Sequence, residues 1–246
     1  MLKKRVIPVL FLMDGKIVRS ERFNDFKVIG DPYTELSRFS EWLADELVYV
    51  DISRKPDFNQ TFKILQKISE YAFMPLTFGG NIRTLEQIGQ IIRGGADKVI
   101  INTGAAMDLG LIPRAAEKFG SQAIVAGIDN LNGRAMIHHG QVDIGFTLEW
   151  AKTLICWGAG EIFLNSVERD GTGMGYDLET IKAVSRAVKV PVVACGGVGQ
   201  LKHFKEGFDV GADAVAAGNF FHFTENAYPR TKKYLHENRV SVRHEE

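Results

Sequence analysis

Two glycine-rich turns are the segments of this chain best suited to bind an anion. Gly79-Gly80 and Gly196-Gly197 each follow an apolar run and precede a helix-like run. Because glycine has no side chain, backbone N–H groups in such a turn can face a ligand directly. The next apolar run of each half ends in small or polar residues, at Asn102-Thr103 and at Gly218-Asn219, which would add further donors. Glycine is also common in tight turns, but the duplication with matching donors favours two phosphate sites.

The two turns belong to an internal repeat. Residues 75–103 and 191–219 share one plan: a proline, a glycine pair, a helix-like run, a Gly-Ala-Asp triplet and an apolar strand. The copies lie about 116 residues apart, close to half of the 246-residue chain. This spacing indicates two fused copies of one half-domain. We therefore expect the functional site between the halves, with a long bisphosphorylated ligand spanning it.

Apolar strands alternate with amphipathic helices along the chain. The strands expected from apolar runs are 5–12, 46–52, 74–78, 98–102, 123–128, 161–164, 190–194 and 214–217, and the clearest helices are 84–93 and 178–188. Near-continuous apolar strands are typical of a parallel sheet covered by helices. Eight of them in a chain of this length predict an α/β protein, a single (βα)8 TIM barrel over residues 1–246 built from two half-barrels. Its active site would lie at the carboxyl ends of the strands.

Composition excludes several classes of function. Thirty basic and thirty acidic residues cancel, which argues against nucleic-acid binding. No apolar run approaches the roughly 20 residues of a membrane helix, and the N-terminus has no cleavage site, so we expect a cytoplasmic protein that does not act on membranes. Cys156 and Cys195 are too few for a disulfide framework. No metal site and no cofactor are predicted, and the expected partners are small molecules or another protein.

Other polar residues at strand ends have less specific signals. Asp51 ends the second predicted strand and is expected to accept a ligand hydroxyl. Asp170 and Gly171 follow the sixth strand in a flexible polar loop and are expected to contact phosphate. Cys195 has no histidine placed to activate it, which favours a packing role. His138-His139 lies in a hairpin-like insertion after the fifth strand, where adjacent histidines are expected to be solvated.

Many short motifs together resemble one known family, HisF, the cyclase subunit of imidazole glycerol phosphate synthase. The resemblance covers nearly the whole chain and rests on Arg5-Val6-Ile7-Pro8, Asp14-Gly15-Lys16, Gly30-Asp31-Pro32, Ala44-Asp45-Glu46-Leu47, Asp51-Ile52, the Gly79-Gly80 turn, Ala96-Asp97-Lys98-Val99, Phe119-Gly120-Ser121-Gln122, Ile128-Asp129, Arg169-Asp170-Gly171-Thr172, Gly175-Tyr176-Asp177-Leu178 and the Gly196-Gly197 turn. It implies a barrel that forms a heterodimer with a glutaminase subunit and receives ammonia along its axis. At the top, ammonia would react with a bisphosphorylated ribulosyl aminoimidazole compound.

The bottom of the predicted barrel keeps the family's ammonia-side residues. The first, second, fourth and sixth strands each begin with a charged residue: Arg5, Glu46, Lys98 and Glu161. Two cations and two anions buried together would satisfy one another. The resemblance implies that these four form a gate for ammonia, although a purely structural plug is an alternative. Asp45 and Asp97 match positions that face the glutaminase, but acids next to strands are often only solvated.

The top of the barrel departs from the family pattern. The family uses two aspartates as general acid and base, and Asp129 matches one of them. Phe11 occupies the position of the other, and a phenyl ring cannot exchange a proton. Asp14, three residues further on, is the candidate substitute acid. Four more positions of the substrate pocket differ from the family's residues: Arg19, Asn165, Cys195 and Asn219.

Three functions stay open. The apolar residue at position 11 favours a HisF-like paralogue, similar to those of acetamidino-sugar pathways for surface polysaccharides, which supplies ammonia with a HisH-like glutaminase to a separate sugar amidotransferase. A second reading is an ammonia-dependent cyclase of histidine biosynthesis, a lyase-type subunit that uses Asp129 alone or with Asp14. A third is a non-catalytic ammonia conduit. The family's sister isomerase is disfavoured because it also needs the first-strand aspartate and has no use for the gate.

Overall fold

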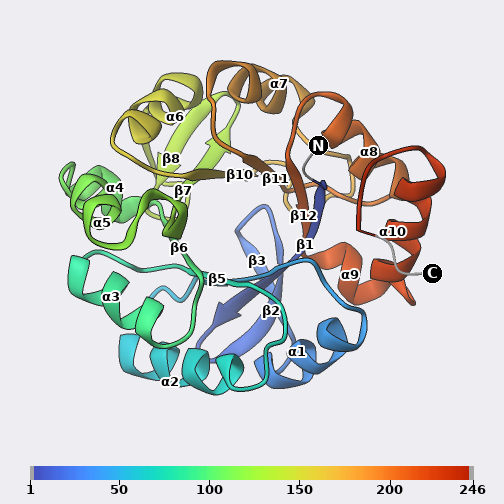
Figure 1. Ribbon diagram of the computed structural model, residues 1–246, viewed down its shortest axis with the longest axis horizontal. Coiled ribbons are helices and arrows are strands. Elements are labelled where there is room, and N and C mark those ends of the chain that lie inside the picture. The colour runs from blue at the N-terminus through green and yellow to red at the C-terminus, as the bar shows by residue number, and fades with distance from the viewer. Residues whose placement is uncertain (1–2, 244–246) are drawn as a thin grey trace.

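Eight parallel strands close into a ring in the computed structural model, which describes residues 3–243 (Figure 1). Residues 1–2 and 244–246 of the predicted domain lie outside the described range. Around the ring the strands are β1 (Arg5–Met13), β4 (Leu47–Asp51), β5 (Leu76–Gly79), β6 (Lys98–Ile101), β7 (Ile124–Leu131), β10 (Glu161–Ser166), β11 (Val192–Cys195) and β12 (Ala214–Ala217). Pairing of β7 with β10 and of β12 with β1 completes the circle. The predicted (βα)8 TIM barrel is confirmed.

Helices surround the strand ring (Figure 1). They are α1 (Pro32–Glu41), α2 (Phe58–Ser69), α3 (Leu85–Arg93), α4 (Thr103–Met107), α5 (Leu111–Phe119), the short 3-10 helix η1 (Ser121–Ala123), α6 (Thr147–Cys156), α7 (Leu178–Ala187), α8 (Leu201–Asp209), α9 (Asn219–Phe223) and α10 (Ala227–Glu237). Helix α3 begins where the sequence predicted, because Thr84 and Gln87 form a capping box. Within residues 3–243 no helix is long and apolar enough to span a bilayer.

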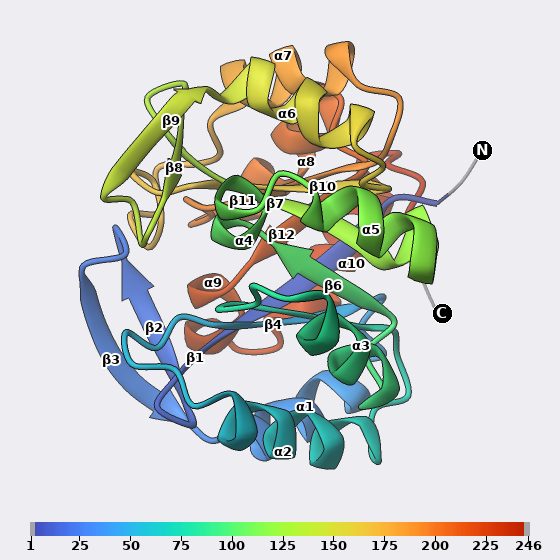
Figure 2. The same cartoon turned by 90° about the vertical axis from the view of Figure 1, so that its left-hand side faces the viewer.

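Two antiparallel hairpins extend from one end of the barrel. β2 (Lys16–Glu21) and β3 (Asp25–Gly30) follow β1, and β8 (Arg134–Ile137) and β9 (Val142–Phe146) follow β7. Figure 2 shows both hairpins at the end opposite the chain termini. The sequence indicated the second hairpin but not the first, because β3 is largely exposed and lacks an apolar run. Both hairpins lie at the carboxyl ends of the strands, where a barrel places its active site.

Strand alternation separates two hydrophobic cores. In β1, Ile7, Val9 and Phe11 point into the barrel, whereas Val6 and Leu10 pack outward against the helices. This follows from the two-residue period of a strand, in which every second side chain faces the same side. Arg5 has the same parity as the inward residues. Arg5 at the start of β1 and Phe11 near its end therefore both face the barrel axis.

The backbone confirms the repeat and corrects its register. Gly80 and Gly196, which lie 116 positions apart, have φ angles of +95° and +96°. The next residues, Asn81 and Gly197, also have positive φ, at +56° and +98°. Positive φ is costly for most residues and is tolerated best by glycine and asparagine. The turn equivalent to Gly196-Gly197 is therefore Gly80-Asn81. The sequence had paired it with Gly79-Gly80, which is one position earlier.

Candidate functional site

Four charged side chains form a closed ring at the bottom of the barrel. Arg5 bridges Glu46 and Glu161 through its two terminal nitrogens. Opposite it, the Lys98 Nζ lies 3.1 Å from Glu46 Oε1 and 2.7 Å from Glu161 Oε2. Thr77 Oγ1 donates a further hydrogen bond to Glu46. The four residues that the sequence selected are thus in mutual contact, and each charge meets two of opposite sign.

The ring favours the charged forms of Glu46 and Arg5. Burial alone would raise the pKa of Glu46, but the nearby Lys98 and Arg5 outweigh it and hold that pKa below its usual value. Burial would likewise lower the pKa of Arg5, and Glu161 and Glu46 reverse that effect and raise it. The two acids are almost fully buried, whereas the two cations keep partial access to solvent. The axis therefore begins with a ring of two acids and two bases in which each side chain contacts two of the opposite type.

The two acids predicted to face a partner differ in surroundings. Asp45 is largely buried, and its carboxylate accepts hydrogen bonds from Lys232 Nζ at 2.6 Å and from the Val6 N–H at 2.9 Å. Asp97 is exposed, and one of its oxygens accepts from the Leu76 N–H at 2.8 Å. Of the two, only Asp97 presents its carboxylate to solvent beside the ring.

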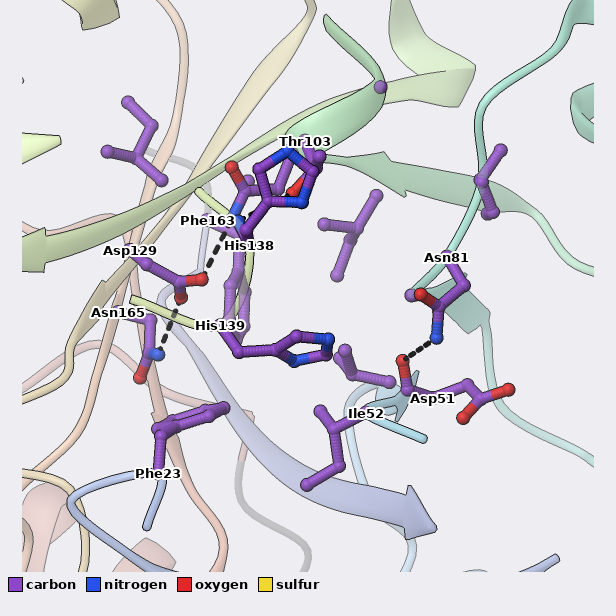
Figure 3. A pocket seen from close by; sticks show the side chains of 18 of the residues that line it. Phe23, Asp51, Ile52, Asn81, Thr103, Asp129, His138, His139, Phe163 and Asn165 are labelled. Atoms are coloured by element: carbon purple, nitrogen blue, oxygen red, sulfur yellow. Dashed lines mark hydrogen bonds between the residues drawn. The ribbon is translucent and has the colours of Figure 1, made fainter. Parts of the chain in front are cut away.

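A pocket opens at the opposite end of the barrel (Figure 3). Apolar side chains from several strands line its floor, among them Phe11, Ile100 and Phe163. Asp51, Asp129 and Asn165 of the predicted site also line it, together with Gly80, Asn102 and Thr103. The structure thus brings together the first phosphate turn, one of the family's two aspartates and the phenylalanine in place of the other.

Asp129 is held between two amides. Its Oδ2 accepts from Asn102 Nδ2 at 2.8 Å, and its Oδ1 accepts from Asn165 Nδ2 at 2.9 Å (Figure 3). Burial raises the pKa of Asp129, although these two hydrogen bonds oppose the rise. Asn165 Oδ1 is buried and has no partner among the described residues. An acid of raised pKa beside an unused acceptor is suited to exchange a proton with a bound ligand.

Phe11 occupies the pocket floor beside the β2–β3 turn. Its ring is buried and packs edge-on against Phe23, with the ring centroids 5.2 Å apart. A side chain at Gly218 would have its Cβ 3.9 Å from the Phe11 ring. The ring therefore fills the space between the first hairpin and the strand end of the second half. This position confirms that residue 11 reaches the pocket.

Asp51 serves its own chain as well as the pocket. Its Oδ1 accepts from the Ser53 N–H at 2.9 Å, and its Oδ2 accepts from Thr61 Oγ1 at 2.6 Å. Asn81 Nδ2 donates to the Asp51 backbone oxygen at 3.2 Å. These bonds fix the Gly80-Asn81 turn against the end of β4. The predicted contact of Asp51 with a ligand hydroxyl stays a prediction.

We expect Gly80→Ala to destabilise the fold strongly. An alanine Cβ at this position would lie 2.0 Å from the Asp51 backbone oxygen, and φ is +95°. The clash and the strained φ together predict a loss of about 3 kcal/mol or more in the free energy of unfolding. Gly133→Ala is the matched control, because φ is +78° but nothing lies within 4 Å. Urea unfolding should show a loss of only about 1 kcal/mol for it. Equal losses would mean that the Gly80 turn is not confined by Asp51.

The β2–β3 hairpin contacts Asn219 and the Asp170-Gly171 loop, which belong to the predicted second phosphate site. Asn219 Nδ2 donates to the Ser20 backbone oxygen at 2.8 Å, and the Arg22 N–H donates to the Asp170 backbone oxygen at 2.9 Å. A Cβ at Gly171 would lie 2.3 Å from the Ser20 oxygen. The top pocket is therefore lined by the first turn and not by the second. Phosphate binding at Gly196, Gly197, Gly218 and Asn219 stays a prediction.

Asp170 lies under the hairpin and is almost fully buried. Burial, together with the negative charges of Asp129 and Glu21, raises the pKa of Asp170 to about 7, against the opposing hydrogen bond from the Phe23 N–H. This carboxyl group therefore titrates near neutral pH instead of staying ionised throughout that range. A neutral carboxyl repels an anion less than a carboxylate does, which is compatible with the predicted contact to phosphate.

Asp14 and Arg19 of the predicted site also lie outside the pocket lining, as does Cys195, which was expected to pack. Asp14 is exposed in the turn between β1 and β2, and its N–H donates to Ser53 Oγ at 2.9 Å. This place does not support a role as substitute acid. Arg19 lies over the Phe223 ring of α9, at 5.8 Å from its centroid. Cys195 is buried at the end of β11, and burial raises the pKa of its thiol well above the usual value, which fits packing rather than nucleophilic attack.

Sequence reasoning missed the histidine pair of the second hairpin. His138 and His139 were expected to be solvated, but both line the top pocket. His139 is exposed, and its ring points over the cavity (Figure 3). Arg83, four residues after Gly79, also lines it. The signal available in the sequence was the position of the hairpin directly after the strand that carries Asp129.

Comparison with known proteins agrees with this geometry. The family described as "Histidine biosynthesis protein" matches residues 5–227. The imidazole glycerol phosphate synthase subunit HisF of Chloroherpeton thalassium is 41% identical over 250 residues, covering 99% of this chain and 100% of the relative. The subunit HisF of Alkaliphilus metalliredigens is 41% identical over 251 residues with the same coverage, and that of Endomicrobium trichonymphae is 39% identical over 250 residues, covering 99% and 96%. The chain therefore belongs to the histidine biosynthesis protein family, and within it to the HisF family.

Proposed function

We propose that this chain receives ammonia from a partner glutaminase through the barrel axis and serves an acceptor other than the substrate of the histidine-pathway cyclase. The observation that carries the proposal is Phe11, whose ring lines the pocket with Asp129 at the position where the family has its second aspartate. An acid–base pair needs two groups that exchange protons, and a phenyl ring exchanges none. The paralogue of acetamidino-sugar pathways is the reading that fits this replacement best.

The interior of the barrel supports passage of a neutral molecule. Above the charged ring, the inner face is apolar, with Ile7, Val9, Val48, Val125 and Ala216 among its residues. An apolar interior disfavours an ion such as ammonium far more than neutral ammonia, because charges lose their hydration there. Asp129 and Asn165 follow at the far end of this path. Ammonia that enters by the ring would thus reach a proton acceptor before it meets solvent.

A cyclase of histidine biosynthesis is the second candidate. It is favoured by the relatives, whose printed name is imidazole glycerol phosphate synthase subunit HisF and which match the chain over nearly its whole length. In that case Asp129 would act with another proton-exchanging group of the pocket. A third candidate is a non-catalytic ammonia conduit. In that case this chain would only pass ammonia on, and a separate sugar amidotransferase would carry out the chemistry.

The first test is partnership with a HisH-like glutaminase. The two purified chains are mixed, and complex formation is followed by analytical ultracentrifugation while glutamine hydrolysis is assayed. We expect a heterodimer and faster hydrolysis of glutamine by the glutaminase in the complex. Complex formation without any change in hydrolysis would reduce this chain to a scaffold. Absence of a complex with any glutaminase subunit of its own organism would refute the ammonia proposal as a whole.

A further inference from the structure

The tip of the β8–β9 hairpin is tied to Thr103, one of the donors predicted for the first phosphate site. The His138 N–H donates to Thr103 Oγ1 at 3.2 Å, across 35 positions of sequence. Both His138 and His139 line the pocket together with Gly80 and Thr103. In Figure 3 the His138 ring lies beside Thr103, and the His139 ring reaches into the space between Asp129 and Ile52. The hairpin thus faces the Gly80 turn from the outer side of the pocket.

The backbone of this tip is held in an uncommon conformation. His138, His139 and Gly140 are consecutive residues with φ angles of +53°, +59° and +82°. Two successive left-handed histidines store strain, which persists where the surrounding contacts over-determine the conformation. Here the hydrogen bond to Thr103 is one such contact. With this backbone, both imidazole rings lie at the pocket.

Positive charge exceeds negative charge around these rings. The groups that act on His139 are Arg54 from the β4–α2 loop, Arg83 from the β5–α3 loop, its neighbour His138, and Asp51. Within residues 3–243 neither Arg54 nor Arg83 forms an ion pair with an acid. Asp51 is the single acid in this set, and Asp129, whose pKa is raised by burial, lines the same pocket. Two arginines against Asp51 leave one positive charge, so a bound dianion would leave one negative charge that a protonated imidazole would offset.

We propose that His138 and His139 form the outer wall of the first phosphate site, so that a phosphoryl group held by the Gly80 turn and Thr103 is closed in by imidazole. The inference rests on the phosphate site predicted at the Gly80 turn, which would hold the phosphorylated acceptor of the proposed function, and adds to it a pH-dependent contact. Burial lowers the pKa of His139 in the empty site, as do Arg54, His138 and Arg83, with Asp51 opposing. A bound dianion would reverse this balance. Binding would therefore take up a proton and become tighter as the pH falls.

Sulfate is the appropriate probe, because it stays doubly charged between pH 6 and pH 8 whereas a phosphate monoester titrates near pH 6. The full-length protein is titrated with sulfate while backbone amide signals of Gly80 and Thr103 and the ring signals of His139 are followed by NMR. We expect the pKa of His139 to rise by about one unit at saturation, which corresponds to roughly threefold to sixfold tighter sulfate binding at pH 6 than at pH 8.

His139→Asn is the test variant, because asparagine tolerates positive φ but does not titrate. We expect it to bind sulfate roughly threefold to sixfold more weakly than the natural chain at pH 6 and to lose the pH dependence. His236→Asn, at an exposed position of α10, is the matched control and should bind as the natural chain does. Shifts at Gly80 and Thr103 without any response of His139 would overturn this inference and leave the phosphate site intact. No shift at any of the three would overturn the phosphate site itself.

Discussion

Phe11→Asp is expected to turn over the bisphosphorylated aminoimidazole substrate of HisF with free ammonia at least about 100-fold faster than the natural chain. The substitution places a carboxyl group in the pocket that already contains Asp129, between Phe23 and the backbone at Gly218. Asp129 keeps its two amide partners, because Asn102 and Asn165 donate directly to its carboxylate and residue 11 takes no part in either hydrogen bond. The pocket would then contain two carboxyl groups able to exchange protons, as the family's reaction requires.

The measurement is substrate consumption with ammonium salt at alkaline pH, without a glutaminase, so that the partner does not affect the rate. Phe11→Asn is the matched control, because it has nearly the same volume as aspartate and loses the same aromatic contact, but it exchanges no proton. Loss of the buried ring should cost both variants about 3 kcal/mol or more of stability, and to a similar extent. Activity of Phe11→Asn equal to that of Phe11→Asp would show that space, and not a missing acid, limits the natural chain. Turnover by the natural chain at a rate typical of enzymes would establish the cyclase reading instead.

Glu46→Gln is expected to lower the free energy of unfolding by about 3 kcal/mol at pH 7. The substitution keeps the shape of the side chain but leaves Arg5 and Lys98 with Glu161 as their single anion in the ring. Removal of one member of a buried ion pair is costly because the remaining charge is desolvated without compensation. The partial exposure of the two cations places the expected loss at the lower end of the usual range.

Urea unfolding at several pH values measures this loss and its sign. The pKa of Glu46 in the folded chain lies below the value of 4.5 that the unfolded chain has, so its stabilising effect is complete above pH 4.5. It disappears as the pH falls through the folded pKa, and the natural chain and Glu46→Gln should then converge. Asp209→Asn removes the surface pair with Lys205 and is the control, with an expected loss below about 1 kcal/mol. A similar loss in both variants would mean that the charged ring stabilises the fold no more than a solvent-exposed ion pair does.

The charged ring was predictable because its members begin strands. Parallel strands of a barrel begin at one end, and alternate residues share a face, so Arg5, Glu46, Lys98 and Glu161 had to meet once eight strands closed. The same reasoning placed Phe11 and Asp129 in one pocket, since each lies near the end of its strand on the inner face. These predictions needed only the period of a strand and the direction of the chain.

The amino-acid sequence by itself therefore determined the barrel, the charged ring and the replacement of an acid by Phe11, because regular strands convert spacing in sequence into position in space. The tertiary structure alone decided which predicted phosphate turn lines the pocket. The place of the β2–β3 hairpin depends on the contact of Ser20 with Asn219, and that of the histidine pair on the contact of His138 with Thr103. Each contact joins a hairpin to the end of a strand far away in the sequence, and the period of a single strand does not fix how such segments pack.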